Sequence, residues 1–175
     1  MDRKRLQVIR FAAAAVLLAG GGVATAVADA PALDIVQLRQ SDEALQATYA
    51  KDKTMNLPRL LLLDGQGQPL LVEVGMRNGV GRRLAKALEG GKPLPSPATL
   101  DRILGEVVDA AGRPVSAGDL PRADAYVVDY WAQWCVPCRL LARDIEGQLK
   151  RWDGKHIVWI KIESDPLKLP DDGQG

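Results

Sequence analysis

Apolar and polar positions follow two different periods in the carboxyl-terminal half of the chain. Residues 125–131 are a largely apolar segment of β-prone residues, which predicts a buried strand. Shortly afterwards apolar positions recur at three- and four-residue steps, which predicts a helix with one buried face. The recurring positions are Leu140, Leu141, Ile145 and Leu149. The pattern therefore predicts a strand, a tight turn and a helix.

A second patterned region lies upstream of this one. Residues 56–63 are an apolar run introduced by a proline, residues 64–69 have turn chemistry, and residues 70–75 return as an apolar segment. Two such runs around a turn predict a β-hairpin. Residues 78–88 then place apolar side chains on one helical face and basic ones on the other, and two glycines follow. This predicts an amphipathic helix with a glycine end.

The segments around these two regions are less regular. Residues 34–50 are predicted to form a short strand followed by a helix that starts near Ser41, with one long helix as the alternative. Residues 92–97 hold three prolines and predict a stiff, extended connector. Residues 103–108 and the turn at 109–114 predict a second hairpin. Residues 157–162 are a last predicted strand, before a polar tail over residues 166–175.

Composition limits the possible functions. The chain has 175 residues, of which 47% are apolar and 26% charged, with a net charge of +1. These values are those of one ordinary globular domain and argue against a nucleic-acid-binding protein.

The first 28 residues have the pattern of a signal peptide. A basic start is followed by the apolar run 11–19 and by the small-x-small site 26–28. We expect residues 1–28 to be removed and to add no element to the fold, and the protein to be periplasmic or otherwise exported. The alternative is a membrane anchor formed by residues 11–28 if the signal is not cleaved.

The chain's two cysteines lie at the predicted strand-to-helix turn. A cysteine attacks as the thiolate, and the free N–H groups and dipole of a helix start would favour a negative sulfur on Cys135. Cys138 follows one turn later, close enough to form a disulfide, and Pro137 suits the first helical turn. We therefore predict that Cys135 is the attacking nucleophile and Cys138 the resolving thiol.

A C-x-x-C pair has two other possible uses. A zinc site needs four ligands, and the chain offers only one histidine, His156, besides the two cysteines. A purely structural disulfide that closes so short a loop would stabilise the fold little. A redox disulfide that needs no cofactor or metal is therefore preferred, and an exported thiol pair would need an upstream redox partner to reset it.

Residues 129–139 resemble the active-site segment of thioredoxins and thioredoxin-like disulfide reductases, and the similarity extends over residues 152–162. The resemblance implies an α/β fold with a central mixed sheet flanked by helices. It also implies that Asp129 is buried behind the disulfide and moves protons, with Lys161 near it. Trp131 would support the site, and Trp134 and Pro137 would bind substrate. The proline that often interrupts the family's active-site helix is absent from residues 142–144.

The upstream hairpin resembles the other half of a thioredoxin. There an apolar residue and a cis-proline open the strand that faces the disulfide, and Leu57 and Pro58 match that opening. Arg59 departs from the family, which usually has a small polar residue there. The resemblance implies that these three residues bind substrate, and that Arg59 could lower the pKa of the thiolate. The alternative is a trans proline that merely starts a remote strand.

The two halves stand in the reverse of the family's order. The prediction is a circularly permuted thioredoxin-like domain over residues 29–165. The cis-proline half would span residues 55–90, the connector 91–98 and the active-site half 99–165. A domain-swapped dimer is the alternative. Residues 157–162 are expected to hold the central place in the sheet, which leaves an edge strand or a helix for residues 34–38.

The predicted function is an exported thiol–disulfide oxidoreductase that acts on the thiols and disulfides of proteins through its Cys-Val-Pro-Cys site, with the reductase direction slightly favoured. The alternative is a thioredoxin-like binding or redox-sensing module without turnover.

Overall fold

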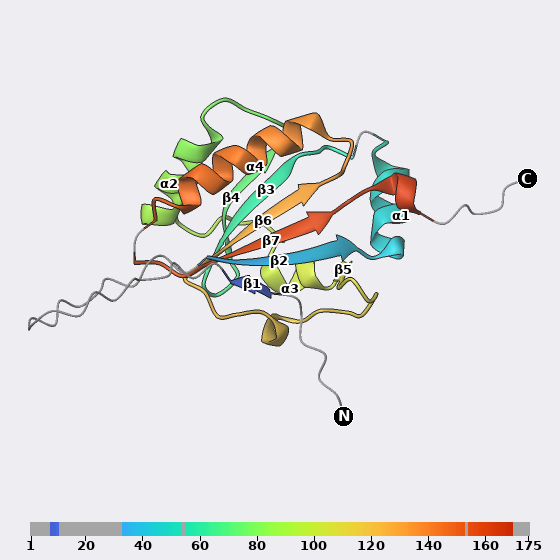
Figure 1. The fold of residues 1–175 in the computed structure, drawn as a ribbon, viewed down its shortest axis with the longest axis horizontal. Coiled ribbons are helices and arrows are strands. Elements are labelled where there is room, and N and C mark those ends of the chain that lie inside the picture. Colours follow the sequence, from blue (N-terminus) through green and yellow to red (C-terminus); the bar gives the residue numbers. More distant parts are fainter. Residues whose placement is uncertain (1–7, 11–32, 54, 153, 170–175) are drawn as a thin grey trace, which may run out of the picture.

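The computed structural model describes residues 8–10, 33–53, 55–152 and 154–169. Strands of these residues form one seven-stranded mixed sheet in the order β1-β2-β7-β6-β3-β4, and β5 also pairs with β2 (Figure 1). The strands are β1 (Val8–Arg10), β2 (Leu33–Gln40), β3 (Arg59–Asp64), β4 (Pro69–Val74), β5 (Val107–Val108), β6 (Ala125–Trp131) and β7 (Ile157–Glu163). The helices are α1 (Asp42–Lys51), α2 (Val80–Gly90), α3 (Leu100–Leu104) and α4 (Val136–Leu149), with short 3-10 helices η1 (Ala117–Asp119) and η2 (Pro166–Lys168).

The middle of the sheet combines both predicted regions. β2, β7 and β6 are parallel, whereas β3 is antiparallel to both β6 and β4. The expectation for residues 157–162 is confirmed, because β7 lies between β2 and β6. The earlier segment forms β2, the next strand outward, and is neither the edge strand nor the helix that was expected, because β1 and β5 pair with its outer side.

Apolar side chains cover both faces of the sheet, since successive residues of a strand point to opposite sides. One face packs against α2 and α4, which Figure 1 shows together on one side of the sheet. The opposite face packs against α3 and the segment that leads to β6. Burial on both faces explains why β6 and β7 are apolar along most of their length instead of alternating.

The ambiguous segment over residues 34–50 forms a strand and a helix, not one long helix. Ser41 separates β2 from α1, and its hydroxyl accepts a hydrogen bond from the amide of Ala44 at 3.2 Å. A serine cap of this kind satisfies an amide that the helix itself leaves without a partner. The predicted hairpin of β3 and β4 and the helix after it are also confirmed, with α2 running over Val80–Gly90.

The second predicted hairpin is correct only in part. The turn at 109–114 forms, with the amide of Asp109 donating to the carbonyl of Arg113 at 2.9 Å and an antiparallel bridge between Val108 and Pro114. The strand before it is shorter than predicted, because residues 103–104 end α3, whose Leu100, Ile103 and Leu104 bury one helical face. Val107–Val108 is extended and also pairs with β2. The connector before α3 returns along the first hairpin, where the amide of Leu100 donates to the carbonyl of Gly67 at 2.9 Å.

Each end of the described chain forms a short element that was not predicted. Val8–Arg10 forms β1 inside the expected signal peptide. Residues 11–28 lie outside the described residues, so cleavage and anchoring stay predictions. Pro166–Lys168, expected in a polar tail, forms η2. None of the helices described here is long and apolar enough to cross a membrane.

Candidate redox site

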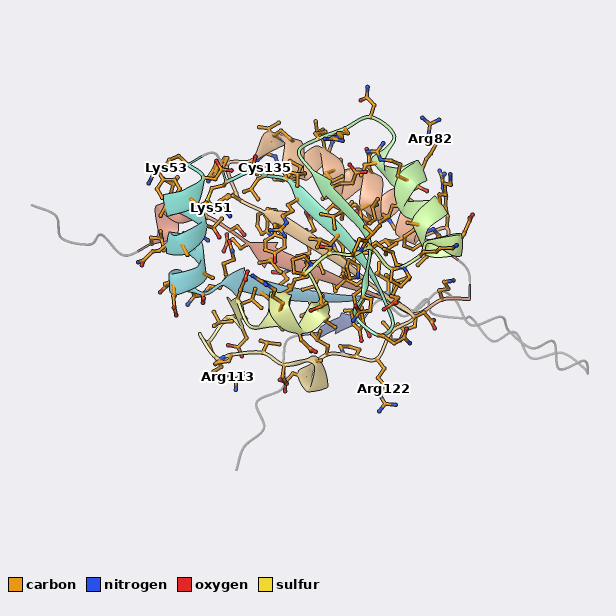
Figure 2. All side chains as sticks on the ribbon, turned by 180° about the vertical axis from the view of Figure 1, so that it is seen from behind. Lys51, Lys53, Arg82, Arg113, Arg122 and Cys135 are labelled. Carbon is orange, nitrogen blue, oxygen red and sulfur yellow. A yellow bond between two sulfur atoms is a disulfide. The ribbon has the colours of Figure 1, made fainter. Side chains whose placement is uncertain are left out.

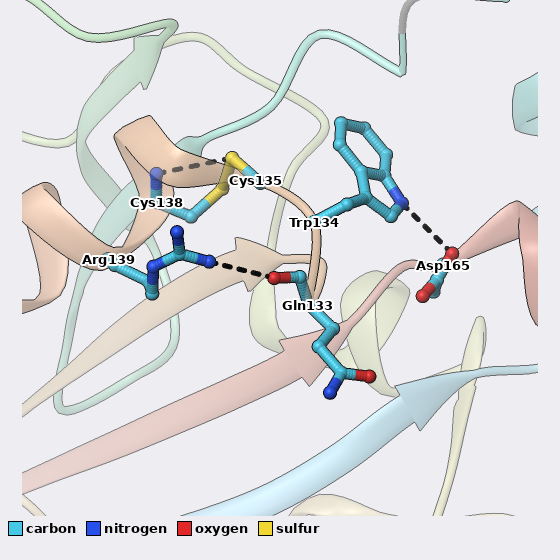
Figure 3. Close-up of a disulfide and its surroundings, with 6 residues drawn as sticks. All are labelled: Gln133, Trp134, Cys135, Cys138, Arg139 and Asp165. Carbon is cyan, nitrogen blue, oxygen red and sulfur yellow. Dashed lines mark hydrogen bonds between the residues drawn. A yellow bond between two sulfur atoms is a disulfide. The ribbon is translucent and has the colours of Figure 1, made fainter.

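Cys135 and Cys138 form a disulfide where β6 passes into α4. The S–S distance is 2.02 Å and the Cα atoms are 5.3 Å apart. Cys135 is the N-cap residue of α4, and its Sγ accepts a hydrogen bond from the amide of Cys138 at 3.2 Å (Figure 3). Pro137 occupies the first turn, where its missing N–H leaves no carbonyl without a donor. The predicted order of strand, turn and helix is confirmed.

The environment of Cys135 favours a thiolate. An N-cap sulfur faces amide groups that the helix does not use, and it lies at the positive end of the helix dipole. Both cysteine side chains are buried in the disulfide form, with exposed fractions of 3% for Cys135 and 2% for Cys138. Position at the helix terminus, not exposure, therefore distinguishes the two sulfurs.

The cis-proline segment reaches this site within one chain. Leu57 and Trp131 pack against the buried cluster of Ala132 and the two cysteines. The peptide bond between Leu57 and Pro58 is cis, as the family resemblance implied. The carbonyl of Pro58 accepts the amide of Gly75 at 2.8 Å, which fixes the segment against the turn after β4. Two segments far apart in sequence thus meet at the disulfide.

Arg59 has a different neighbour from the one expected. Its guanidinium lies over the ring of Tyr130, 5.2 Å from the ring centroid. Tyr130 follows Asp129 on β6 and so points to the opposite face of the sheet. Burial raises the pKa of Tyr130 to about 12, against an opposing effect of Arg59. The contact that the structure gives to Arg59 is therefore with Tyr130, and its effect on the thiolate stays a prediction.

Asp129 is completely buried on β6, with an exposed fraction of 0%. Neither carboxylate oxygen has a hydrogen-bond partner among the described residues. Its neighbours across the sheet are Leu60 on β3 and Lys161 on β7. Burial raises the pKa of Asp129 to about 7, and the positive charge of Lys161 lowers it in part. A group with this pKa can both accept and release a proton near neutral pH.

Lys161 lies between two aromatic rings. Its Nζ is 4.8 Å from the ring centroid of Trp159 and 5.6 Å from that of Trp131. Lys161 was expected near Asp129, and the register of β6 and β7 places the two residues opposite each other. Trp159 was not predicted to belong to the site. Its position two residues before Lys161 on one strand is the signal that could have found it.

Trp134 is the exposed aromatic residue beside the disulfide, with an exposed fraction of 46%. Its indole N–H donates to Oδ1 of the buried Asp165 at 3.0 Å (Figure 3). The same oxygen accepts the amide of Leu167 at 3.1 Å. Asp165 was assigned only to the end of the domain. An aspartate followed by proline at a helix start is the signal that could have found it.

Replacing Asp165 with alanine is expected to destabilise the fold and to release Trp134. Both hydrogen bonds to Oδ1 would be lost, which predicts a fall in the free energy of unfolding of about 1–3 kcal/mol. Urea unfolding measures the loss, and faster hydrogen exchange at the Trp134 indole would report the release. Asp101→Ala, at an exposed position on α3, is the control. An unchanged indole exchange rate would contradict the positioning of Trp134 by Asp165.

Two lysines lie at the same end of the molecule as the disulfide. Figure 2 shows Cys135 at the end of the molecule that carries Lys51 and Lys53, whereas Arg113 and Arg122 lie on another side. Nζ of Lys53 is 4.1 Å from the ring centroid of Tyr49. On α4, Arg139 donates to the carbonyl of Gln133 at 2.9 Å. No group of three or more potential metal ligands occurs within the described residues.

Comparison with known proteins gives partial matches to thioredoxins. A thioredoxin of Buchnera aphidicola subsp. Acyrthosiphon pisum is 44% identical over 46 residues, which are 26% of this chain and 43% of that protein. A thioredoxin of Buchnera aphidicola subsp. Baizongia pistaciae is 43% identical over 47 residues, again 43% of its length. The chloroplastic M-type thioredoxin of Spinacia oleracea is 44% identical over 39 residues, 21% of its length. No family model and no solved structure matches the chain.

These matches support a thioredoxin-like family. The chain spans less than half the length of these thioredoxins. The α/β architecture, a mixed sheet flanked by helices, fits a thioredoxin-like fold. The thioredoxin-like features that the structure brings together are the disulfide at the start of α4, the buried Asp129 opposite Lys161, and Leu57 next to a cis peptide bond.

Proposed function

We propose that this protein is a thiol–disulfide oxidoreductase that exchanges disulfides with protein substrates through Cys135 and Cys138. The observation that carries the proposal is the disulfide at the amino terminus of α4, with the unpartnered carboxylate of Asp129 on the strand that leads to it. A structural disulfide would have no use for a buried acid on the adjoining strand, whereas an exchange reaction must move protons.

In the reductase direction, the Cys135 thiolate attacks one sulfur of a substrate disulfide. A mixed disulfide forms, and the other substrate sulfur leaves as a thiolate that takes up a proton. The Cys138 thiolate then attacks Sγ of Cys135, which forms the Cys135–Cys138 disulfide and releases the second substrate thiol. Two electrons and two protons pass from the cysteine pair to the substrate, whose disulfide becomes two thiols.

Asp129 would act in the second step. Cys138 must lose its proton before it can attack, and it is 2% exposed, so bulk water is a poor acceptor. A buried carboxylate whose pKa is about 7 can accept that proton at neutral pH. We assign Asp129 this role of base, with Lys161 stabilising its charged form.

We further propose that the two thioredoxin-like halves occur in permuted order. Three observations support this: β3 is antiparallel to β6, Leu57 packs against the cysteines of the same chain, and α2 packs beside α4. The connector after α2 joins the halves. Substrate would dock on Trp134, Pro137 and the Leu57–Arg59 segment.

Replacing Leu57 with alanine is expected to slow the reaction with protein disulfides several-fold more than the reaction with a small disulfide such as that of dithionitrobenzoate. Its side chain packs against the cysteines, so a large substrate would contact it while a small reagent would not. Stopped-flow rates with both oxidants measure the ratio. Leu94→Ala, a half-exposed leucine of the connector, is the control. Equal slowing with both oxidants would remove Leu57 from the docking surface.

An insulin-reduction assay tests the function. With dithiothreitol as reductant, the protein should accelerate precipitation of the insulin B chain well above the rate with dithiothreitol alone. A thioredoxin-like binding or sensing module would be reduced by dithiothreitol but would give no acceleration. That result would favour the alternative function.

We also propose that the protein is exported and works with an upstream partner that resets its disulfide. The support is the signal-like pattern of residues 1–28. The reduction potential decides the direction of exchange. A value of about −270 mV would favour a reductase, whereas a value of about −120 mV would favour an oxidant of substrate thiols. Mass spectrometry of the exported protein would test cleavage after Ala28.

A further inference from the structure

The face of the sheet beneath α4 carries two tryptophans around the Asp129–Lys161 pair. Asp129 and Trp131 lie on one face of β6, and Trp159 and Lys161 lie on the same face of β7. The ammonium of Lys161 is nearer to the ring of Trp159 than to that of Trp131, at 4.8 Å against 5.6 Å. Both distances are within the range of cation–π attraction.

Trp159 is unusual because its indole N–H is buried without a hydrogen-bond partner among the described residues. The side chain is 3% exposed, and its Nε1 has no hydrogen-bond partner among the described residues. A buried donor without a partner costs about 1–3 kcal/mol. A leucine or phenylalanine would fill the same apolar cluster without that cost, so packing alone does not explain an indole here. The contact between the face of its ring and Lys161 explains the indole, because tryptophan attracts a cation more strongly than phenylalanine.

We propose that Trp159 is a positioning residue that holds the ammonium of Lys161 beside the buried carboxylate of Asp129, and so controls when Asp129 takes up and releases its proton. Lys161 is only partly buried, and a lysine side chain without such a contact would extend into water. A charge held near a buried group acts more strongly than one that is solvated and mobile. The inference rests on the proposed function, in which Asp129 is the base.

Other charged groups surround this pair and must be considered. Glu163 lies next along β7, and Arg39 is its neighbour on β2. Glu163 binds Lys168 at 2.7 Å, and Arg39 binds Asp42 at 2.8 Å. On α4, Glu146 binds Lys150, which lowers the pKa of Glu146, and Lys161 has a smaller effect in the same direction. Each of these groups has an ion-pair partner, whereas Asp129 has none among the described residues and faces Lys161 across the sheet.

The test is the titration of Asp129 in the oxidised protein, followed by carbon NMR of its carboxyl group. Trp159→Leu removes the ring face, so the ammonium should move into water and the charged carboxylate should lose stabilisation. We expect the midpoint of the Asp129 titration to rise by at least about half a pH unit. Trp159→Phe keeps a weaker ring face and should give a smaller rise. If the leucine variant does not fold, the phenylalanine variant carries the test.

The same substitutions in a Lys161→Met protein show whether Trp159 acts by positioning the Lys161 charge or by changing the solvation of Asp129. In Lys161→Met, replacing Trp159 should cause no further shift, because the charge that it holds is gone. Trp152→Leu, a buried tryptophan of the same apolar cluster, is the control and should leave the titration unchanged. A fall of the midpoint, no change, or an equal shift in the Lys161→Met background would overturn the proposal. The titration needs no turnover, so these results would not bear on the exchange activity itself.

Discussion

Replacing Cys135 with serine is expected to lower the rate of protein-disulfide reduction by at least about a thousandfold. Cys135 is the N-cap of α4, and its sulfur accepts a hydrogen bond from the Cys138 amide. The helix terminus therefore stabilises this sulfur as a thiolate. A serine hydroxyl is not ionised near neutral pH and cannot form a mixed disulfide. Insulin reduction with dithiothreitol measures the loss.

Replacing Cys138 with serine should have a different result, which serves as the matched control. The first step would remain, so a mixed disulfide between Cys135 and the substrate should accumulate because the second step is blocked. Non-reducing electrophoresis and peptide mass mapping would detect the adduct. If Cys138 forms the adduct when Cys135 is absent, and Cys135 forms none when Cys138 is absent, the roles of the two cysteines are reversed.

Replacing Asp129 with asparagine is expected to slow insulin reduction about tenfold or more at neutral pH, and to stabilise the fold. The rate falls because the resolving thiol loses its base. The fold gains stability because asparagine removes the cost of burying a charge that has no hydrogen-bond partner in the described part of the chain. Loss of activity with a gain in stability is the combination expected of a functional buried acid.

The sign of the pH dependence follows from the raised pKa. The pKa of Asp129 is about 7 in the folded protein and about 3.9 in an unfolded chain. Between these values the folded state keeps a proton that the unfolded state has lost, so rising pH destabilises the wild type. The total loss is about 4 kcal/mol by pH 7, and it does not occur in the asparagine variant. Below about pH 4 the two proteins should have similar stability.

Urea unfolding at several pH values between 4 and 8 measures this difference. Asp144→Asn, an exposed position on α4, is the control and should follow the wild type at every pH. A stability difference that is the same at pH 4 and pH 8 would mean that Asp129 does not titrate in this range. An unchanged rate of insulin reduction would place Asp129 in a structural role.

The central part of the fold could be predicted because its signals are local. The strand, turn and helix around Cys135 follow from a change of period, and the hairpin at β3 and β4 follows from turn chemistry between two apolar runs. The place of β7 and the cis bond at Pro58 required the family resemblance in addition. No local pattern states which strand pairs with which.

The errors lie where tertiary contacts decide. The strand expected over residues 103–108 is extended only at Val107–Val108, because residues 103–104 complete a helix whose apolar face the core on that side of the sheet buries. The contact between Arg59 and Tyr130 was not predicted, and the effect of Arg59 on the thiolate stays a prediction. Asp165 was missed because its partner, Trp134, is distant in sequence. Trp159 was missed because its contact with Lys161, two residues later on the same face of β7, becomes visible only in the folded sheet.

The most direct test of the central claim is a single-turnover reaction between the reduced protein and insulin under anaerobic conditions. Acid quenching, thiol labelling and mass spectrometry would follow both partners at once. The redox proposal predicts that the Cys135–Cys138 disulfide forms at the same rate as one insulin disulfide is lost, with one disulfide gained for each disulfide lost. Insulin that stays oxidised while the cysteines stay reduced would contradict it.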